Sequence, residues 1–340
     1  MTRTPEVAAT ARDPNIPRSF HKGSDGSLKC AIAPREIAEA VRSGTGELWV
    51  DIDSTNRHQI ALLEKVFAFH PLAIEDTLNP NSRVKLEEYE GYIFLIIRGV
   101  RFLEETEDPY DLDTFNICFF LGENYLVTVH AGTSASIESV AEQVERSPES
   151  LGRGVERLMH AVMDVAVDAY FPLMDQLDAF IDGLEESVFV QFDQAALRDI
   201  FSVKRLVLSL RRHLAPQREV FNILTNRPSA LLTPETQVYF RDIYDHTLRI
   251  NDSIDTYRDL LNSVMDSYLT QTSNRLGSVT KGLSVIATAS IPFVVVSGMW
   301  GMNFIHVPLE ATPFGFWIML VIQLAIGGGL LWLLHRKGLL

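Results

Sequence analysis

A stripe of eight residues near the C-terminal end of the sequence has the spacing and chemistry to line a path for cations. Successive members lie three or four positions apart, and most are small or carry a hydroxyl, with one carboxylate at the start. They are Asp266, Thr270, Ser273, Gly277, Thr280, Ser284, Ala287 and Ile291. On an α-helix this spacing places all eight on one face, called here the small-residue stripe. A lipid-facing stripe would be large and apolar, so this one predicts either close helix packing or a face turned toward a water-filled pore.

The stripe runs into the most apolar part of the chain. Between Leu283 and Leu334 the only formally charged residue is Glu310. This region predicts two transmembrane helices, over residues 278–300 and 314–334, because each apolar run approaches the roughly 20 residues that cross a bilayer core. A buried helical hairpin in a soluble core is the alternative, but such helices seldom run this long without charge. Two spans cannot enclose an aqueous path, so a pore requires several copies of the chain around a symmetry axis.

Basic residues flank the two spans on one side only. Arg275 and Lys281 precede the first span, and Arg336 and Lys337 follow the second, whereas the loop over residues 301–313 has no Lys or Arg. The excess of basic residues on cytoplasmic loops therefore predicts cytoplasmic termini, an external loop and a basic cytosolic tail over residues 335–340.

The overall composition excludes several classes of protein. The formal net charge of -14 disfavours a nucleic-acid partner, because the chain would repel phosphate. Cys30 and Cys118 are the only cysteines, which disfavours a disulfide framework or a thiolate zinc site. Residues 1–27 contain no apolar core of a signal peptide and predict a flexible cytosolic tail.

The rest of the cytosolic part divides by its pattern of secondary structure. Residues 28–133 alternate β-rich runs with helical spacing, which predicts an α/β domain. Residues 134–277 predict long helices, over 154–190, 193–224 and 233–277, with prolines at or near the breaks: Pro216, Pro228 and Pro234. The fold class is therefore α+β, an α/β sandwich followed by long helices and two C-terminal transmembrane helices.

An acidic stripe follows one face of the first long helix. Its members, at offsets of three, four or seven, are Asp164, Asp168, Asp175, Asp178, Asp182 and Glu185. A solvated face opposite a packed apolar stripe explains this pattern most simply. A reservoir that concentrates cations near the pore is the functional alternative.

The first span closes on the tripeptide Gly301-Met302-Asn303, at the mouth of the small external loop. Alone, this tripeptide is a weak signal that also suits a helix C-terminal turn. Together, W-G-M-N-F and the following Val307-Pro308 resemble the signature of the CorA magnesium channels. The likeness continues through residues 45 to 310 in LWVDID, HPLAIEDTLN, YFPLMDQLD, PQREV, YFRDIYDHT and DSYL.

The resemblance implies a funnel-shaped homopentamer in the bacterial inner membrane, with the first span lining the pore. Gly301, Met302 and Asn303 are then the selectivity filter, in which a ring of Asn303 amide oxygens accepts hydrogen bonds from hydrated Mg²⁺. This ion gives up its water reluctantly, and fixed charge at that point would hinder release. Mg²⁺ is the expected cargo, with Co²⁺ and Ni²⁺ as further candidates, and no nucleotide is implied.

The resemblance also implies that cytosolic Mg²⁺ closes the channel through acids at subunit boundaries. The matching residues are Asp76 and Asp242, with Glu75 and Asp245 as neighbours that could assist. The structural alternative is that Asp76 caps a turn and Asp242 pairs with a base. His70 and His246 lie in the same motifs and are interpreted as structural.

Two features, the residue at position 277 and the external loop, depart from the pattern of the family. Gly277 stands where a polar asparagine is common near the inner mouth, so the inner ion site is in doubt and Thr280 could replace it. The external loop carries His306 and Glu310, which could attract cations, and a histidine there suits softer metals better than Mg²⁺.

Two other functions are weighed against a magnesium channel. A zinc transporter resembling ZntB belongs to the same superfamily, but that branch often has G-I-N in place of G-M-N, so Met302 disfavours it. A membrane-anchored enzyme is the third class, and the sequence shows no nucleophile–base constellation, no His/Cys cluster and no phosphate-binding loop.

Overall fold

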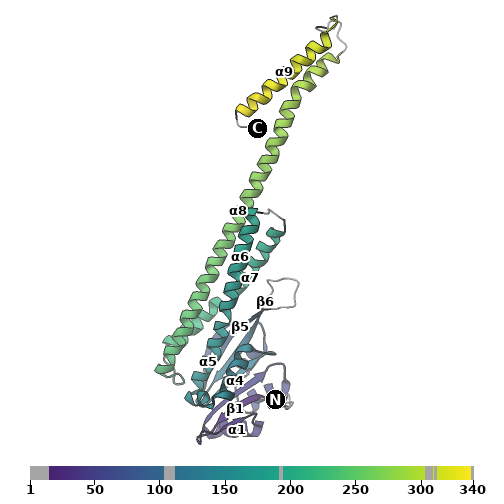
Figure 1. Cartoon of the computed structure of the whole chain (residues 1–340). Coiled ribbons are helices and arrows are strands. Elements are labelled where there is room, and N and C mark those ends of the chain that lie inside the picture. Colours follow the sequence, from purple (N-terminus) through teal and green to yellow (C-terminus); the bar gives the residue numbers. More distant parts are fainter. Residues whose placement is uncertain (1–14, 103–111, 191–193, 303–308, 310–311, 338–340) are drawn as a thin grey trace, which may run out of the picture. The chain divides into compact units, whose positions relative to one another are not determined.

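The computed structural model describes residues 15–102, 112–190, 194–302, 309 and 312–337. Its contacts divide the chain into two compact units, drawn in Figure 1. The first unit comprises Met1–Ser187 and Gln194–Asn262, and the second comprises Val188–Asp193 and Ser263–Leu340.

The first unit is built on a sheet of seven strands in the order β2-β1-β3-β7-β6-β5-β4. Among the described neighbouring pairs, β3 and β7 run parallel and the others run antiparallel. The strands are β1 (Arg18–Lys22), β2 (Leu28–Cys30), β3 (Glu47–Asp53), β4 (Lys85–Tyr89), β5 (Tyr92–Phe102), β6 (Leu112–Leu121) and β7 (Tyr125–His130).

Helices cover both faces of this sheet, because its central strands are apolar on both sides. Alternate residues of β3, such as Leu48 and Val50, join a core with the short helices α1 (Pro34–Ser43), α2 (Arg57–Lys65) and α3 (Pro71–Leu78). Trp49 points to the other face, where α5 (Val155–Asp168) contacts β3, β5, β6 and β7. A helix α4 (Ala135–Arg146) and a 3₁₀ turn (Pro148–Arg153) precede α5.

Long helices make up most of the remaining chain: α6 (Tyr170–Val190), α7 (Gln194–Asn226), α8 (Pro234–Trp300) and α9 (Gly315–Arg336). The single helix expected over residues 154–190 is two helices, α5 and α6, that meet at Ala169. Pro216 lies inside α7 and not at a helix end. The helix continues past this proline because Leu214, Val220 and Phe221 on either side of it are buried.

The expectation of a flexible tail over residues 1–27 is wrong for its last part. Residues 18–22 form β1, which pairs with β3, and the Phe20 side chain is fully buried. Its ring stacks on Trp49 with 5.2 Å between ring centroids. This strand has one large apolar residue in five, so its pairing partner, and not its own pattern, defines it.

Candidate functional site

The apolar segments of the second unit are helical and exposed. Helices α8 and α9 each contain an apolar stretch long enough to cross a membrane. In α8, 0% of this stretch is buried, and in α9, 11% of it is buried. The side chains of Val294, Phe316, Trp317, Val321 and Trp332 are each more than 60% exposed. A core helix of a soluble protein would bury such residues, so a lipid environment is the surrounding these two helices require.

One face of α8 packs on α9. Gly327 of α9 lies against the Phe293 ring, so closely that a Cβ at this position would be 2.6 Å from the ring. The Gln323 side chain of α9 donates hydrogen bonds to the Phe293 carbonyl and the Ser297 hydroxyl, both at 2.9 Å. Phe293 and Ser297 therefore mark the face of α8 that contacts α9.

The small-residue stripe lies on the other side of α8. All eight of its residues are exposed in the single chain. At about 100° per residue, Ile291 is turned about 200° from Phe293, and the rest of the stripe follows Ile291. The stripe therefore faces away from α9.

The helix α8 ends at the predicted filter. The Gly301 amide donates to the Ser297 carbonyl at 3.0 Å, and the Met302 amide donates to the Met299 carbonyl at 3.3 Å. Met302 is 54% exposed. The other predicted residues of this region, Asn303, His306 and Glu310, lie outside the described residues.

Asp76 lies in a pocket of about 590 Å³ in the first unit, called here the acidic pocket. Helix α3 brings Glu75 and Asp76 to it, because His70 caps the helix by accepting from the Leu72 amide at 3.2 Å and Pro71 opens its first turn. Strand β4 contributes Glu87 and Glu88, and the cations in its wall are Lys85 and Arg227.

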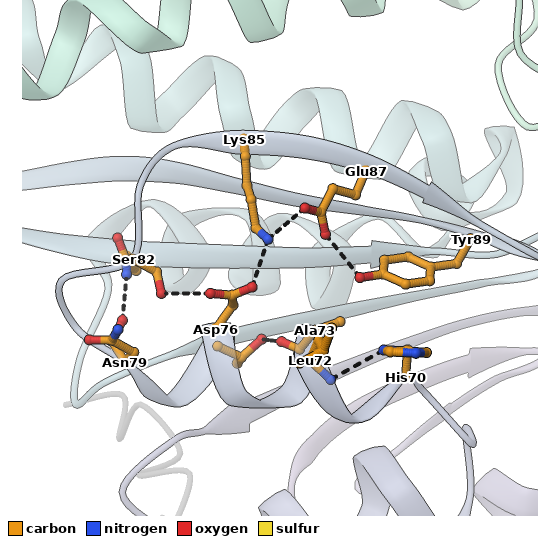
Figure 2. A network of polar contacts seen from close by, with 11 residues as sticks. His70, Leu72, Ala73, Asp76, Asn79, Ser82, Lys85, Glu87 and Tyr89 are labelled. Atoms are coloured by element: carbon orange, nitrogen blue, oxygen red, sulfur yellow. Dashed lines mark hydrogen bonds and ion pairs between the residues drawn. The ribbon is translucent and has the colours of Figure 1, made fainter.

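Figure 2 shows that Asp76 already has partners. Lys85 Nζ lies 2.6 Å from Asp76 Oδ2 and 2.7 Å from Glu87 Oε1, and the Ser82 hydroxyl donates to Asp76 Oδ1 at 3.3 Å. Burial lowers the pKa of the Lys85 ammonium, but the bonds to Asp76 and Glu87 outweigh burial and raise that pKa. Burial and Glu87 raise the pKa of the Tyr89 hydroxyl, which donates to Glu87, to about 12.

Asp242 lies in a different group, in which one chain alone brings together ligands suitable for a metal ion. One ligand atom each from Asp164 of α5 and from Asp242 and His246 of α8 lie within 4.8 Å of one another. The sequence did not predict this Asp164–Asp242–His246 cluster, since Asp164 was interpreted only as a member of the acidic stripe and His246 as structural. The signal available in the sequence was the spacing of four between Asp242 and His246, which places them on one helix face.

The charges of this cluster favour a cation. Burial and the neighbouring carboxylates of Asp168 and Asp242 raise the pKa of Asp164, against the opposing influence of His160 and His246. His246 Nδ1 is 3.1 Å from Asp168 Oδ1, which leaves Nε2 on the side of Asp242 at 3.9 Å. Asp242 itself is 69% exposed.

The two predicted regulatory acids are not brought together within one chain. No hydrogen bond or ion pair joins Asp76 to Asp242 among the residues described, and Asp245 is exposed and lies outside both groups. Any direct contact between Asp76 and Asp242 therefore requires a second copy.

An α+β unit followed by two exposed apolar helices indicates a membrane protein, and the acidic groups of that unit could bind cations. The model of the family described as "CorA-like Mg2+ transporter protein" matches residues 45–336 of this chain. The chain is 30% identical over 291 residues to the cobalt/magnesium transport protein CorA of Thermotoga maritima, covering 83% of this chain and 80% of that protein. It is 32% identical over 289 residues to YfjQ of Bacillus subtilis, named as a metal ion transporter, with 85% and 88% covered. The chain thus belongs to the CorA-like Mg²⁺ transporter family, whose members transport divalent cations and are not enzymes.

Solved structures share its fold. The complete CorA magnesium transporter of Methanocaldococcus jannaschii superposes with a TM-score of 0.82 at 20% identity, covering 95% of this chain and 99% of that one. The cytoplasmic domain of ZntB from Vibrio parahaemolyticus superposes with a TM-score of 0.61 at 14% identity, covering 76% and 98%. The predicted fold class, an α+β unit with long helices and two C-terminal apolar helices, is confirmed. Nothing in these likenesses favours the zinc-transporter alternative.

Proposed function

We propose that this protein is a channel through which Mg²⁺ enters the cytoplasm across the bacterial inner membrane, as a homopentamer with α8 around the pore. The observation that carries this proposal is the position of the small-residue stripe, which is exposed and turned away from α9. Such a face needs an aqueous surrounding or identical neighbours, and a ring of α8 helices provides both. The flanking basic residues support cytoplasmic termini.

The proposed entrance is a ring of Gly301, Met302 and Asn303 from each copy. Amide oxygens bind the water shell of Mg²⁺ without removing it, and their neutral charge permits release. An interior-negative potential drives a cation inward by roughly 2.3 kcal/mol per charge per 100 mV, hence about 4.6 kcal/mol for a divalent ion. Transport therefore requires no nucleotide.

The proposed gate responds to cytosolic Mg²⁺ bound at the acidic groups of the first unit. Asp242, supported by Asp164 and His246, is the principal ligand, and Glu75 and Asp76 of a neighbouring copy complete the site, with Asp245 as an accessory charge. Because His246 adds an imidazole nitrogen, this site should also accept Co²⁺ and Ni²⁺, which bind nitrogen ligands more tightly than Mg²⁺ does.

The pore assignment is tested by blocking the stripe. In a variant with Cys30 and Cys118 replaced by Ser, cysteines are introduced singly at Thr280 and Ser284, and at Ser297 as the control on the face toward α9. A bulky, water-soluble thiol reagent should cut Mg²⁺ flux into proteoliposomes at least fivefold at Thr280 and Ser284, and less than twofold at Ser297. Equal inhibition at all three positions would contradict a pore lined by the stripe.

A further inference from the structure

A second pocket in the first unit is basic, although the protein as a whole is acidic. It has a volume of about 440 Å³ and lies between α7 and the segment that joins α3 to β4. Its wall includes Asn81, Arg83, Arg98, Arg212, His213 and Pro216, and it is called here the arginine pocket. No carboxylate lines it among the described residues, in a chain of formal net charge -14.

Arg98 is the most buried of these cations, with 8% of its surface exposed. Its guanidinium donates to two neutral carbonyls, that of Ser82 from Nη2 at 3.2 Å and that of Thr114 from Nη1 at 3.5 Å. In the part of the chain that the structure describes, no carboxylate forms an ion pair with Arg98, Arg83 or Arg212, although the charge of Asp113 acts on Arg98 from nearby. Burying a charge without a bonded counter-ion is costly unless something else compensates it.

His213 lies close to the positive charges of this pocket. Its Nδ1 lies 3.4 Å from the Thr114 hydroxyl. Burial, and then the charges of Arg98 and Arg212, lower the pKa of His213. Burial and the two neighbouring guanidinium groups therefore both favour the neutral form of His213.

We propose that the arginine pocket binds a small soluble anion with two or more phosphate groups. Guanidinium groups bind phosphate oxygens through paired hydrogen bonds, and three arginines line this pocket together with Asn81. The volume exceeds what a single phosphate fills and lies within the usual range for small-ligand sites, about 300 to 1,000 Å³. Pyrophosphate and the diphosphate group of a nucleotide carry the matching charge and fit within this volume.

The arginine pocket is connected to the acidic pocket through one residue. The Ser82 carbonyl accepts from Arg98, and the Ser82 hydroxyl donates to Asp76. Asn81 and Arg83 flank Ser82 on the same segment. An anion bound to these two residues therefore changes the surroundings of Asp76. If Asp76 takes part in the proposed gate, anion binding and Mg²⁺ binding change each other's affinity by the same factor. Only this coupling, and not anion binding itself, rests on the proposed function.

The experiment measures anion binding, which does not depend on transport. Pyrophosphate is titrated by calorimetry into the full-length protein in a nonionic detergent, without Mg²⁺ and with chelator, and orthophosphate is titrated in parallel. Wild-type protein should bind pyrophosphate with one site per chain and at least tenfold more tightly than orthophosphate. Arg83→Gln and Arg212→Gln should each weaken pyrophosphate binding at least tenfold.

Arg211→Gln is the matched control, because Arg211 neighbours Arg212 on α7 but pairs with Asp255, 3.1 Å away. It removes the same charge and should change binding less than twofold. Absence of binding to wild-type protein, or an equal loss in all three variants, would overturn the proposal. A smaller oligomer for Arg83→Gln in native mass spectrometry, with no pyrophosphate binding to wild type, would instead assign the pocket to a carboxylate of a second copy. Transport by wild-type protein that binds no pyrophosphate would leave the proposed channel function intact.

Discussion

Asp76 and Asp242 differ in what a cation has to displace. Asp76 is bonded to Lys85 at 2.6 Å, and this pair is about two-thirds buried, so a metal ion must compete with an ammonium group for the carboxylate. Asp242 is 69% exposed, and its neighbours Asp164 and His246 add ligands to it. Asp242 should therefore contribute more than Asp76 to Mg²⁺ binding.

This difference predicts graded effects on Mg²⁺-dependent protection from protease. Asp242→Asn should raise the Mg²⁺ concentration for half-maximal protection about tenfold, a change of about 1.4 kcal/mol, and Asp76→Asn should raise it by a smaller factor. Asp242→Lys should protect without Mg²⁺, because an ammonium opposite a carboxylate can hold the closed contact. Asp252→Asn, an exposed acid on the same helix, serves as the control. Superimposable titrations for wild type, Asp76→Asn and Asp242→Asn would exclude both acids from the sensor.

Asn303 gives the second prediction for a single residue. Asn303→Ala should reduce Mg²⁺ uptake to below a tenth of wild type while expression and assembly persist, because only the amide ring that binds the hydrated ion is lost. A Mg²⁺-sensitive dye enclosed in proteoliposomes measures the rate of Mg²⁺ uptake. Uptake above half of the wild-type rate would remove Asn303 from the filter.

At the scale of elements, sequence patterns predict the strands whose side chains pack against a large apolar surface. The strands β3, β5, β6 and β7 are rich in β-branched and aromatic residues and form the β-rich runs of the predicted α/β domain. The strands β1, β2 and β4 (RSFHK, LKC and KLEEY) are polar and exist through hydrogen bonds to their neighbours, so their own sequences carry little signal.

The candidate sites follow the same division. The small-residue stripe and the end of α8 at Gly301 and Met302 could be predicted, because a helix fixes which residues share a face. The grouping of Asp164 with Asp242 and His246 joins two helices whose relative rotation comes from packing, and no local pattern encodes that rotation. The bond between Lys85 and Asp76 likewise depends on how α3 and β4 meet.

The contact between α8 and α9 gives a prediction for the helix pair. Gly327→Ala should destabilise the protein by about 1 to 3 kcal/mol, because the new methyl group meets the Phe293 ring. Gly328→Ala and Gly329→Ala are matched controls, since nothing lies within 4 Å of a Cβ at either position. Thermal unfolding in detergent measures the difference. Phe293→Leu should restore part of the loss in Gly327→Ala, and equal stability of all three alanine variants would contradict close packing at Phe293.

For the whole molecule, the proposed pore requires several copies of the chain. A single chain leaves all eight stripe residues uncovered, and two spans cannot enclose water. Purified protein should therefore give one homo-oligomer in native mass spectrometry, expected from the family resemblance to contain five chains. Monomers or dimers alone, under conditions that preserve Mg²⁺ transport, would contradict both the pore and the proposed assembly.

The parallel pairing of β3 with β7 has a consequence for how the chain is made. The register joins Asp53 to His130, so the middle of the sheet is complete only once His130 has left the ribosome. The apolar run that starts at Leu283 follows about 150 residues later, which is roughly 8 to 30 s of synthesis at ~5–20 residues per second. Mixed α/β domains fold well within that interval. The sheet and the neighbouring helix α3 should therefore be folded before the first membrane-spanning segment has been synthesised, so insertion into the bilayer begins from a chain in which Glu75 and Asp76 are already in place.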